Sequence, residues 1–218
     1  MKSLRRLPRL VFVCGNFDSP IYIRFLPAML RHSTSAQTHK KLKLKNGPKV
    51  IIRDLVDSEL TDVYSLIQLP EVFDKGFGLE TYPDEANFKK KMTLADKYVL
   101  EEDVNQNIIA YIILHKSRFN RGVRNADALI IVRPECMSPD VLETCLSLAT
   151  SLARAARFRG LYVDTFASNT EVMKAVRGIP GFSEVAQLPS WTLDHSDVTS
   201  IIFYKELDIR TQCFQCCI

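Results

Sequence analysis

Residues 128–169 read ALIIVRPECMSPDVLETCLSLATSLARAARFRGLYVDTFASN. The run Ala128–Val132 is short, apolar and rich in β-branched residues, as is typical of a buried strand. From Val141 to Phe158, apolar residues recur every three or four positions, which predicts a helix with one face on a core. Leu161–Val163 predicts a second strand. The segment is therefore expected to form a strand, a helix and a parallel strand joined by a right-handed crossover.

This predicted unit creates a place for an anion. The N-terminus of the helix lies beside the carboxyl end of the first strand in such a crossover. The unpaired N–H groups of the first helical turn and the positive end of the helix dipole meet there. The turn between the first strand and the helix is therefore a natural anion site.

Charge is unevenly distributed along the 218-residue chain, whose net charge is +4. Residues 1–49 carry 11 of the 29 Lys and Arg residues and a single acid, Asp18. The excess of positive charge therefore belongs to the leader, and the remainder is mildly acidic, which disfavours a nucleic-acid binder. The length and the 46% hydrophobic content predict one domain with a real core, plus extensions.

The basic leader, 1–48, has two interpretations. Its arginines lie among apolar residues, acids are nearly absent and Ser33-Thr34-Ser35 follows, as in a mitochondrial transit peptide. The alternative is a disordered basic tail on a cytoplasmic protein. A secretory signal fits less well because the apolar run Leu10–Cys14 is short, and no stretch approaches the roughly 20 apolar residues of a membrane span.

The six cysteines are scattered and show no disulfide framework, which favours a reducing compartment. The tail, 208–218, contains Cys213-x-x-Cys216, but no second pair or nearby histidine accompanies it, so no metal site is expected. Between leader and tail, residues 49–207 are expected to form the domain. The further predicted strands are 50–55, 98–100, 108–114, 182–186 and 200–204, and the further helices begin near Ser58, Pro83 and Thr170.

This order of elements, with the residues at its centre, resembles the GNAT family of acetyl-CoA-dependent N-acetyltransferases over roughly Val50–Leu207. ALIIVRP is similar to the family's fourth strand, which ends in V-x-P, and LYVDTFASN is similar to its fifth strand. Gly181-Phe182 is similar to the G-F that follows the family's fourth helix. The resemblance implies a single α/β domain with a mixed, mostly antiparallel sheet, splayed central parallel strands and flanking helices.

The resemblance also implies acetyl-CoA as cosubstrate, inserted between the splayed strands. Its pantetheine arm would pair with the strand backbone, and its pyrophosphate would lie on the turn before the helix. The residues implied in this binding are Leu129, Ile130, Ile131, Val132, Arg133, Met137, Ser138, Asp140, Val141 and Asn169.

The turn departs from the family pattern. The family's turn is glycine-rich, which lets the backbone approach the pyrophosphate closely, but none of the corresponding residues 137–142 is glycine. Ser138-Pro139 is a good helix start, yet Pro139 has no N–H to offer. Glu135 and Asp140 bring negative charge, which costs about 1 kcal/mol each near a phosphate, and Arg133 offsets part of it. Coenzyme binding and a mere helix cap both remain open for this turn.

The family's usual acid is also missing. Many members place a tyrosine seven residues after the position of Asn169, where this chain has Val176, and no tyrosine occurs from 163 to 203. The candidate catalytic residues are Asp127, His115 and Ser168. A nearby helix N-terminus lowers the pKa of a thiol, but Cys136 has no obvious histidine partner, so a role as nucleophile is the less favoured interpretation of this residue.

The loop between the first two helices supplies substrate contacts in this family. Here it offers Phe77, Glu80 and Tyr82, an aromatic wall with one acid that suits an amine. The chain is therefore expected to be an N-acyltransferase in which a primary amine, of a small molecule or a protein, attacks acetyl-CoA directly. The alternative is a catalytically degenerate acetyltransferase fold that acts as a binding or scaffold module. The sequence leaves the oligomeric state open.

Overall fold

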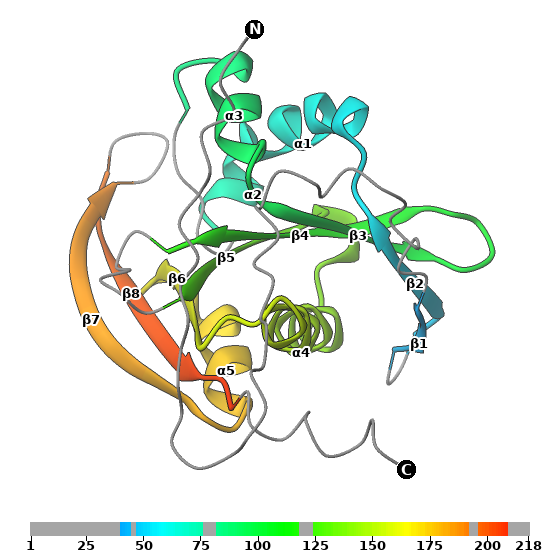
Figure 1. The fold of residues 1–218 in the computed structure, drawn as a ribbon. Helices are drawn as coiled ribbons and strands as arrows, with labels where there is room; N and C mark the ends of the chain where they lie inside the picture. The colour runs from blue at the N-terminus through cyan, green and yellow to red at the C-terminus, as the bar shows by residue number, and fades with distance from the viewer. Residues whose placement is uncertain (1–39, 45–46, 76–81, 118–123, 192–195, 209–218) are drawn as a thin grey trace, which may run out of the picture. The chain divides into compact units, whose positions relative to one another are not determined.

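The computed structural model describes residues 40–44, 47–75, 82–117, 124–191 and 196–208. Eight strands form one sheet in the order β1-β2-β3-β4-β5-β6-β8-β7 (Figure 1). The strands are β1 (Lys40–Lys43), β2 (Lys49–Asp54), β3 (Asp96–Glu102), β4 (Ile108–Lys116), β5 (Asn125–Val132), β6 (Gly160–Phe166), β7 (Phe182–Trp191) and β8 (Asp197–Glu206).

All neighbouring strands are antiparallel except β5 and β6. This confirms the predicted mixed sheet and its parallel central pair. The strand β1 was not predicted, because its sequence KKLK carries no apolar run; it falls within the basic stretch 1–48. Lysines are common on edge strands, where they discourage pairing with other chains.

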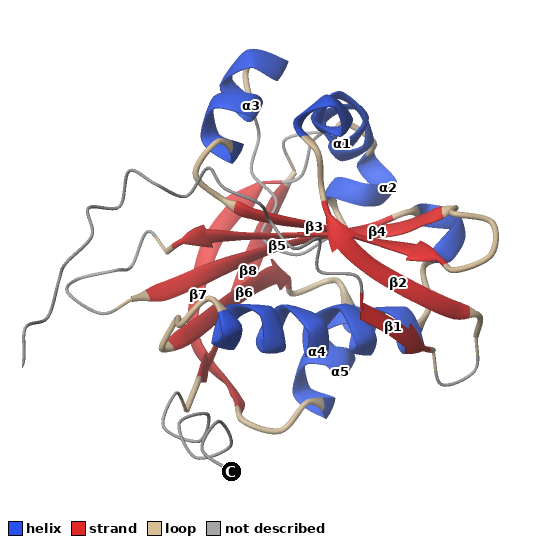
Figure 2. Cartoon of the chain, turned by 45° about the vertical axis from the view of Figure 1, so that its right-hand side comes forward, coloured by secondary structure: helices blue, strands red, loops and turns tan. Residues whose placement is uncertain are grey.

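Helices cover both faces of the sheet (Figure 2). One face carries α1 (Leu60–Ile67), α2 (Pro70–Phe73) and α3 (Glu85–Met92), and the other carries α4 (Pro139–Ala155) and α5 (Thr170–Gly178). We call these the α1 face and the α4 face. No helix in the described ranges is long and apolar enough to cross a membrane.

The two faces divide the core by strand alternation. On β5, Ala126, Ala128, Ile130 and Val132 pack in the cluster with α4, whereas Leu129 and Ile131 pack in the cluster with α1 and α3. The helix α4 begins at Pro139, as the sequence predicts, because proline suits the first turn of a helix. The Ser138 hydroxyl caps the helix by accepting a hydrogen bond from Val141 N–H at 3.3 Å.

A part-buried ion pair fastens the turn Asp57–Glu59 (η1) before α1 to the sheet. Arg53 of β2 donates to Glu59 at 2.7 Å and to Glu101 of β3 at 2.8 Å. These contacts lower the pKa of Glu59 below its ordinary value, the hydrogen bond from Arg53 being the main cause. The ion pair therefore stabilises the fold fully when the pH is above about 4.5, the ordinary pKa of a glutamate. This stabilisation is lost as the pH falls through the lowered pKa of Glu59.

We expect Glu59→Gln to lower the free energy of unfolding by about 1 to 3 kcal/mol at neutral pH. The difference from wild type should shrink as the pH falls below 4.5. Urea denaturation between pH 7 and pH 3 measures it. Lys41→Met, which removes the more exposed Lys41–Asp103 pair, is the control and should change stability little. A difference that stays constant down to pH 3 would contradict the ion-pair explanation.

Candidate functional site

The strands β5 and β6 diverge soon after they begin. They pair at only three positions, Asn125 with Gly160, Ala126 with Leu161 and Asp127 with Tyr162. Beyond this level β5 continues along β4 to Val132, and β6 continues along β8 to Phe166. The sheet is therefore split between the carboxyl halves of its two central strands.

The backbone of β5 has a defined orientation at this split. Arg133 N–H donates to Ile109 C=O on the β4 side, and Asn125 C=O accepts from Ser117 N–H on the same side. Because antiparallel backbone groups alternate between the two edges of a strand, the odd-numbered residues of β5 face β4. The N–H and C=O groups of Ala128, Ile130 and Val132 consequently face the split.

The turn before α4 uses several of its own N–H groups. Cys136 N–H donates to Arg133 C=O and Met137 N–H to Pro134 C=O, which makes the short 3₁₀ turn Pro134–Cys136 (η2). Val141 N–H is taken by the Ser138 cap, and the Met137 side chain packs against the core of the α4 face. Met137 and Val141, both expected to lie on the pyrophosphate, thus already donate inside the protein, which leaves fewer donors for an anion.

Arg133 lies beside Tyr111 on the α1 face. Burial raises the pKa of Tyr111, and the nearby Arg133 guanidinium opposes that shift. Arg133 Nη1 is 3.7 Å from Glu135 Oε1, so the pair reduces the negative charge that Glu135 brings to the turn. Tyr111 Oη and Arg133 Nε are both buried and make no hydrogen bond of ordinary geometry with another described residue.

Asn169 lies at the N-terminus of α5, close after the end of β6. Its Oδ1 accepts from Val172 N–H at 3.5 Å and so caps the helix. Its Nδ2 is buried and has no hydrogen-bond partner among the described residues. A buried donor without an acceptor costs about 1 to 3 kcal/mol, and a bound acceptor removes that cost. The neighbouring Ser168 is exposed.

His115 and Asp127 are brought together. They are cross-strand partners on β4 and β5, and Tyr162 of β6 is the next partner at the same level. Alternation places all three on the α1 face, since Tyr111 and Ile113 of β4, like Leu129 of β5, pack there. All three side chains are half-buried, and one carboxylate oxygen of Asp127 is shielded from solvent. The sequence alone left the face of Asp127 undecided.

Sequence reasoning missed a pair of tyrosines at this level. Tyr162 and Tyr204 of β8 are register partners with ring centroids 4.8 Å apart. The two residues lie immediately before and after the segment 163–203, which contains no tyrosine. No local signal links them, because they become neighbours only when β8 pairs with β6.

The surroundings of Cys136 do not favour a nucleophilic thiol. Burial raises its pKa, and the carboxylates of Glu135 and Glu102 raise it further, while Arg133 opposes them. The thiol is therefore held protonated, and the helix N-terminus does not outweigh these effects.

Of the expected substrate residues, Phe77 and Glu80 lie outside the described residues. Tyr82 packs edge-on against Phe88, with ring centroids 5.1 Å apart, and Lys91 Nζ lies 5.5 Å from its ring centre. These contacts make Tyr82 part of the α1-face packing.

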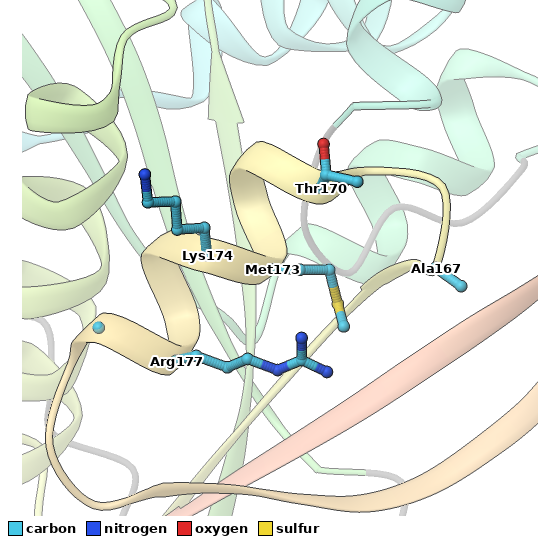
Figure 3. A pocket seen from close by; sticks show the side chains of 6 residues that line it. Ala167, Thr170, Met173, Lys174 and Arg177 are labelled. Atoms are coloured by element: carbon cyan, nitrogen blue, oxygen red, sulfur yellow. The ribbon is translucent and has the colours of Figure 1, made fainter.

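A pocket of about 410 Å³ lies against α5 (Figure 3). Lys174 and Arg177 both line this pocket, and their side chains extend away from each other in this view. Arg177 is also paired with Glu184 at 3.3 Å, so the pocket does not gather positive charge. Its lining residues are Ala167, Thr170, Met173, Lys174, Arg177 and Gly178.

Comparison of the sequence with protein-family models finds no match, and comparison with curated proteins finds none either. Many solved structures, however, share the fold. A GNAT-superfamily phosphinothricin acetyltransferase from Sinorhizobium meliloti, in complex with acetyl-CoA, is 18% identical with a TM-score of 0.60, covering 72% of this chain and 88% of that one. Spermidine N-acetyltransferase from Vibrio cholerae, in complex with CoA and spermine, is 16% identical with a TM-score of 0.58, covering 72% and 95%.

A GCN5-related N-acetyltransferase from Kribbella flavida is 14% identical with a TM-score of 0.59, covering 72% of this chain and 98% of that one. The structural similarity establishes the fold. Because the sequence identities are low, the chemistry has to be argued from the residues of this chain. Among the described strands, β5 and β6 are the one parallel pair. They diverge, and each is followed by a helix N-terminus, which agrees with these structures. The domain therefore has the fold of the GNAT-superfamily N-acetyltransferases.

Proposed function

We propose that the chain is an acetyl-CoA-dependent N-acyltransferase that moves an acetyl group to a primary amine. The observation that carries the proposal is the split between β5 and β6, which the N–H groups of Ala128, Ile130 and Val132 face. The buried, unpartnered Nδ2 of Asn169 adds a donor beside β6. An extended ligand with amide carbonyls, such as a pantetheine arm, can accept hydrogen bonds both from the β5 backbone N–H groups and from Asn169 Nδ2.

Each residue has a role in this proposal. Coenzyme bound in the split supplies an activated thioester acyl group. The β5 N–H groups hold amide and acyl oxygens in line, which contributes most when the donors are fixed in advance. Asp127, half-buried at the level where the strands part, accepts a proton from the amine, and His115 opposite it holds the carboxylate in place. The C–S bond of the thioester breaks as the amide bond forms, and the coenzyme leaves as a thiolate. Burial and the charges of Tyr162 and Glu206 raise the pKa of Tyr204, so its hydroxyl stays protonated and can donate a proton to this thiolate.

A second candidate is a degenerate acetyltransferase fold that serves as a binding module. The turn 134–138 favours it, because Cys136 and Met137 donate within the turn and Pro134 and Pro139 have no N–H. Such a turn binds pyrophosphate less well than a glycine-rich one.

Calorimetric titration of acetyl-CoA into the full chain separates the two candidates. A dissociation constant in the micromolar range supports the transferase. No heat and no thermal shift at millimolar acetyl-CoA would overturn it and leave the binding module.

The two roles of Asn169 can be separated by substitution. Asn169→Asp keeps a capping oxygen but removes the Nδ2 donor, so we expect nearly wild-type stability and about tenfold weaker acetyl-CoA binding. Asn169→Ala removes both, and we expect it to lose about 1 kcal/mol of stability as well. Calorimetry and urea denaturation measure the two effects. Wild-type affinity in Asn169→Asp would show that Nδ2 does not contact the coenzyme.

A further inference from the structure

Five basic residues gather at one end of the sheet, around the C-terminus of α4. Arg124 directly precedes β5, Arg159 directly precedes β6, and Lys205 lies near the end of β8. These strand ends are neighbours, because Arg159 N–H donates to Arg124 C=O at 2.6 Å and β6 pairs with β8. Arg154 lies in the last turn of α4, and Arg157 lies just beyond it. We call these five residues the basic end.

The basic end belongs to the α4 face. Arg124 lies 5.0 Å from the ring centre of Phe158, a core residue of that face. Lys205 Nζ lies 5.3 Å from the ring centre of Phe182, which packs on the same core. Alternation with the core residues of β6 gives Arg159 the same face. The other two members belong to α4 itself and to the turn that follows it, so the five form one surface.

The positive charge of this surface is not neutralised within the described part of the chain. None of the five cations forms an ion pair with a described carboxylate. Lys205 donates to the carbonyl of Pro180 at 2.5 Å, which is a neutral group. Burial lowers the pKa of Lys205, and the charge of Arg154 lowers it further, so like charges repel here. The dipole of α4 offsets part of this repulsion within its last turn, but a bound anion would offset it across the whole surface.

The backbone of Arg157 gives independent evidence. Its φ is 62°, in the left-handed region, directly after the C-cap residue Ala156. Glycine is the usual residue at this position after a helix, because a Cβ disfavours the left-handed conformation. The chain therefore keeps a cationic side chain where glycine is more stable. Strain of this kind is found at functional positions.

We propose that the basic end docks an acidic segment of a partner protein, a function beyond acyl transfer. Its three strand ends span about 10 Å, because neighbouring strands lie about 4.8 Å apart. An extended chain with several Asp or Glu residues fits this width, and guanidinium groups pair with carboxylates through two hydrogen bonds. The 17 residues of α4, about 25 Å in length, separate this surface from the turn before the helix. A docked segment therefore leaves the coenzyme site open.

Other polyanions fit the basic end less well. The chain beyond its leader is mildly acidic, and Glu206 is exposed next to Lys205 along β8. A nucleic-acid duplex is broader than the basic end and would meet like charge at its margins. A membrane surface is disfavoured because none of the exposed large apolar residues in the described ranges lies on α4, β5, β6 or β8.

The first test measures binding of a fluorescent hexaglutamate peptide to the full chain by anisotropy. We expect saturable binding at about 50 mM NaCl that weakens at higher salt, since exposed charges are screened. Arg159→Glu should weaken it by at least about tenfold, because a like charge then meets the peptide. Lys90→Glu makes the same charge change at an exposed position of α3 and should keep the affinity. No binding in the wild type, or equal weakening by the two variants, would overturn the proposal.

The second test uses the backbone of Arg157. Arg157→Gly removes the charge and relieves the backbone, so we expect a higher urea midpoint together with about fivefold weaker peptide binding. Gln106→Gly is the matched control, because Gln106 also has a left-handed φ, of 55°, but precedes the start of β4, whereas the basic end lies beside the end of that strand. It should raise the midpoint and keep the affinity.

Unchanged peptide affinity in Arg157→Gly would contradict the role of this residue and overturn the proposal. Tighter binding of a short RNA duplex, or of vesicles of phosphatidylglycerol and phosphatidylcholine, than of hexaglutamate would overturn the choice of an acidic protein segment. Each of these measurements is made without acetyl-CoA. The result for the basic end is therefore independent of whether the chain is a transferase.

Discussion

Val132→Pro is expected to weaken acetyl-CoA binding by at least about tenfold while the domain stays folded. The N–H of Val132 faces the split and not β4, so proline removes a donor to the coenzyme without breaking the β4–β5 ladder. Proline suits this position because the preceding residue is extended, as X-Pro requires. The smaller side chain costs about 1 to 2 kcal/mol of stability. Calorimetry and urea denaturation of the full chain measure both effects.

Ile131→Pro is the matched control, one residue away. Its N–H faces β4, so proline there removes a ladder hydrogen bond and is expected to cost about 3 kcal/mol or more. The pair of variants tests the orientation of the strand edge as well as the coenzyme site. Wild-type affinity in a folded Val132→Pro variant would show that the split does not hold the coenzyme at this residue.

Gly160→Ala is expected to destabilise the domain by about 1 to 3 kcal/mol, since overpacking forces neighbouring groups to shift. An added methyl group would overlap the ring and hydroxyl of Tyr204 and lie 2.7 Å from Asn125 Oδ1. Tyr204 would have to turn away from Tyr162, and the aromatic pair would open. Urea denaturation measures the loss, and near-ultraviolet circular dichroism follows the tyrosines.

A double-mutant cycle identifies the cause. In a Tyr204→Ala background the main clash is absent, so Gly160→Ala should cost much less than it does in the wild type. Gly178→Ala is the control substitution, because no atom lies within 4 Å of the added methyl group. Equal costs of Gly160→Ala in the two backgrounds would exclude Tyr204 as the group that clashes.

The elements of the central unit were predictable because their patterns are strong and local. The helix α4 repeats apolar residues over 17 positions, and the strands on either side are bounded apolar runs. The strand β1 and the four-residue α2 were not predictable, since β1 is nearly all lysine and α2 is too short to show a period. Pairing with β2 makes KKLK a strand, and that pairing is not written in the segment itself.

The site was only partly predictable, for a related reason. The split of β5 and β6 was implied by the resemblance to the GNAT family, whereas the capping role of Asn169 was not predicted. The face of Asp127 depends on the register of β5 against β4, which a one-residue slip would reverse. The Tyr162–Tyr204 contact joins residues 42 positions apart, and the raised pKa of Cys136 depends on burial and on Glu102 of β3. Both effects exist only in the assembled sheet.

The short pairing of β5 with β6 has a mechanical consequence. Within the sheet, only the three paired positions of β5 and β6 connect the part formed by β1–β5 to the part formed by β6–β8. Sub-global opening starts where few backbone hydrogen bonds hold two units together. We therefore expect sub-global opening of the domain to begin at this seam. The helix α4 packs on β4, β5 and β6 and so bridges the seam, which keeps local opening from becoming global unfolding.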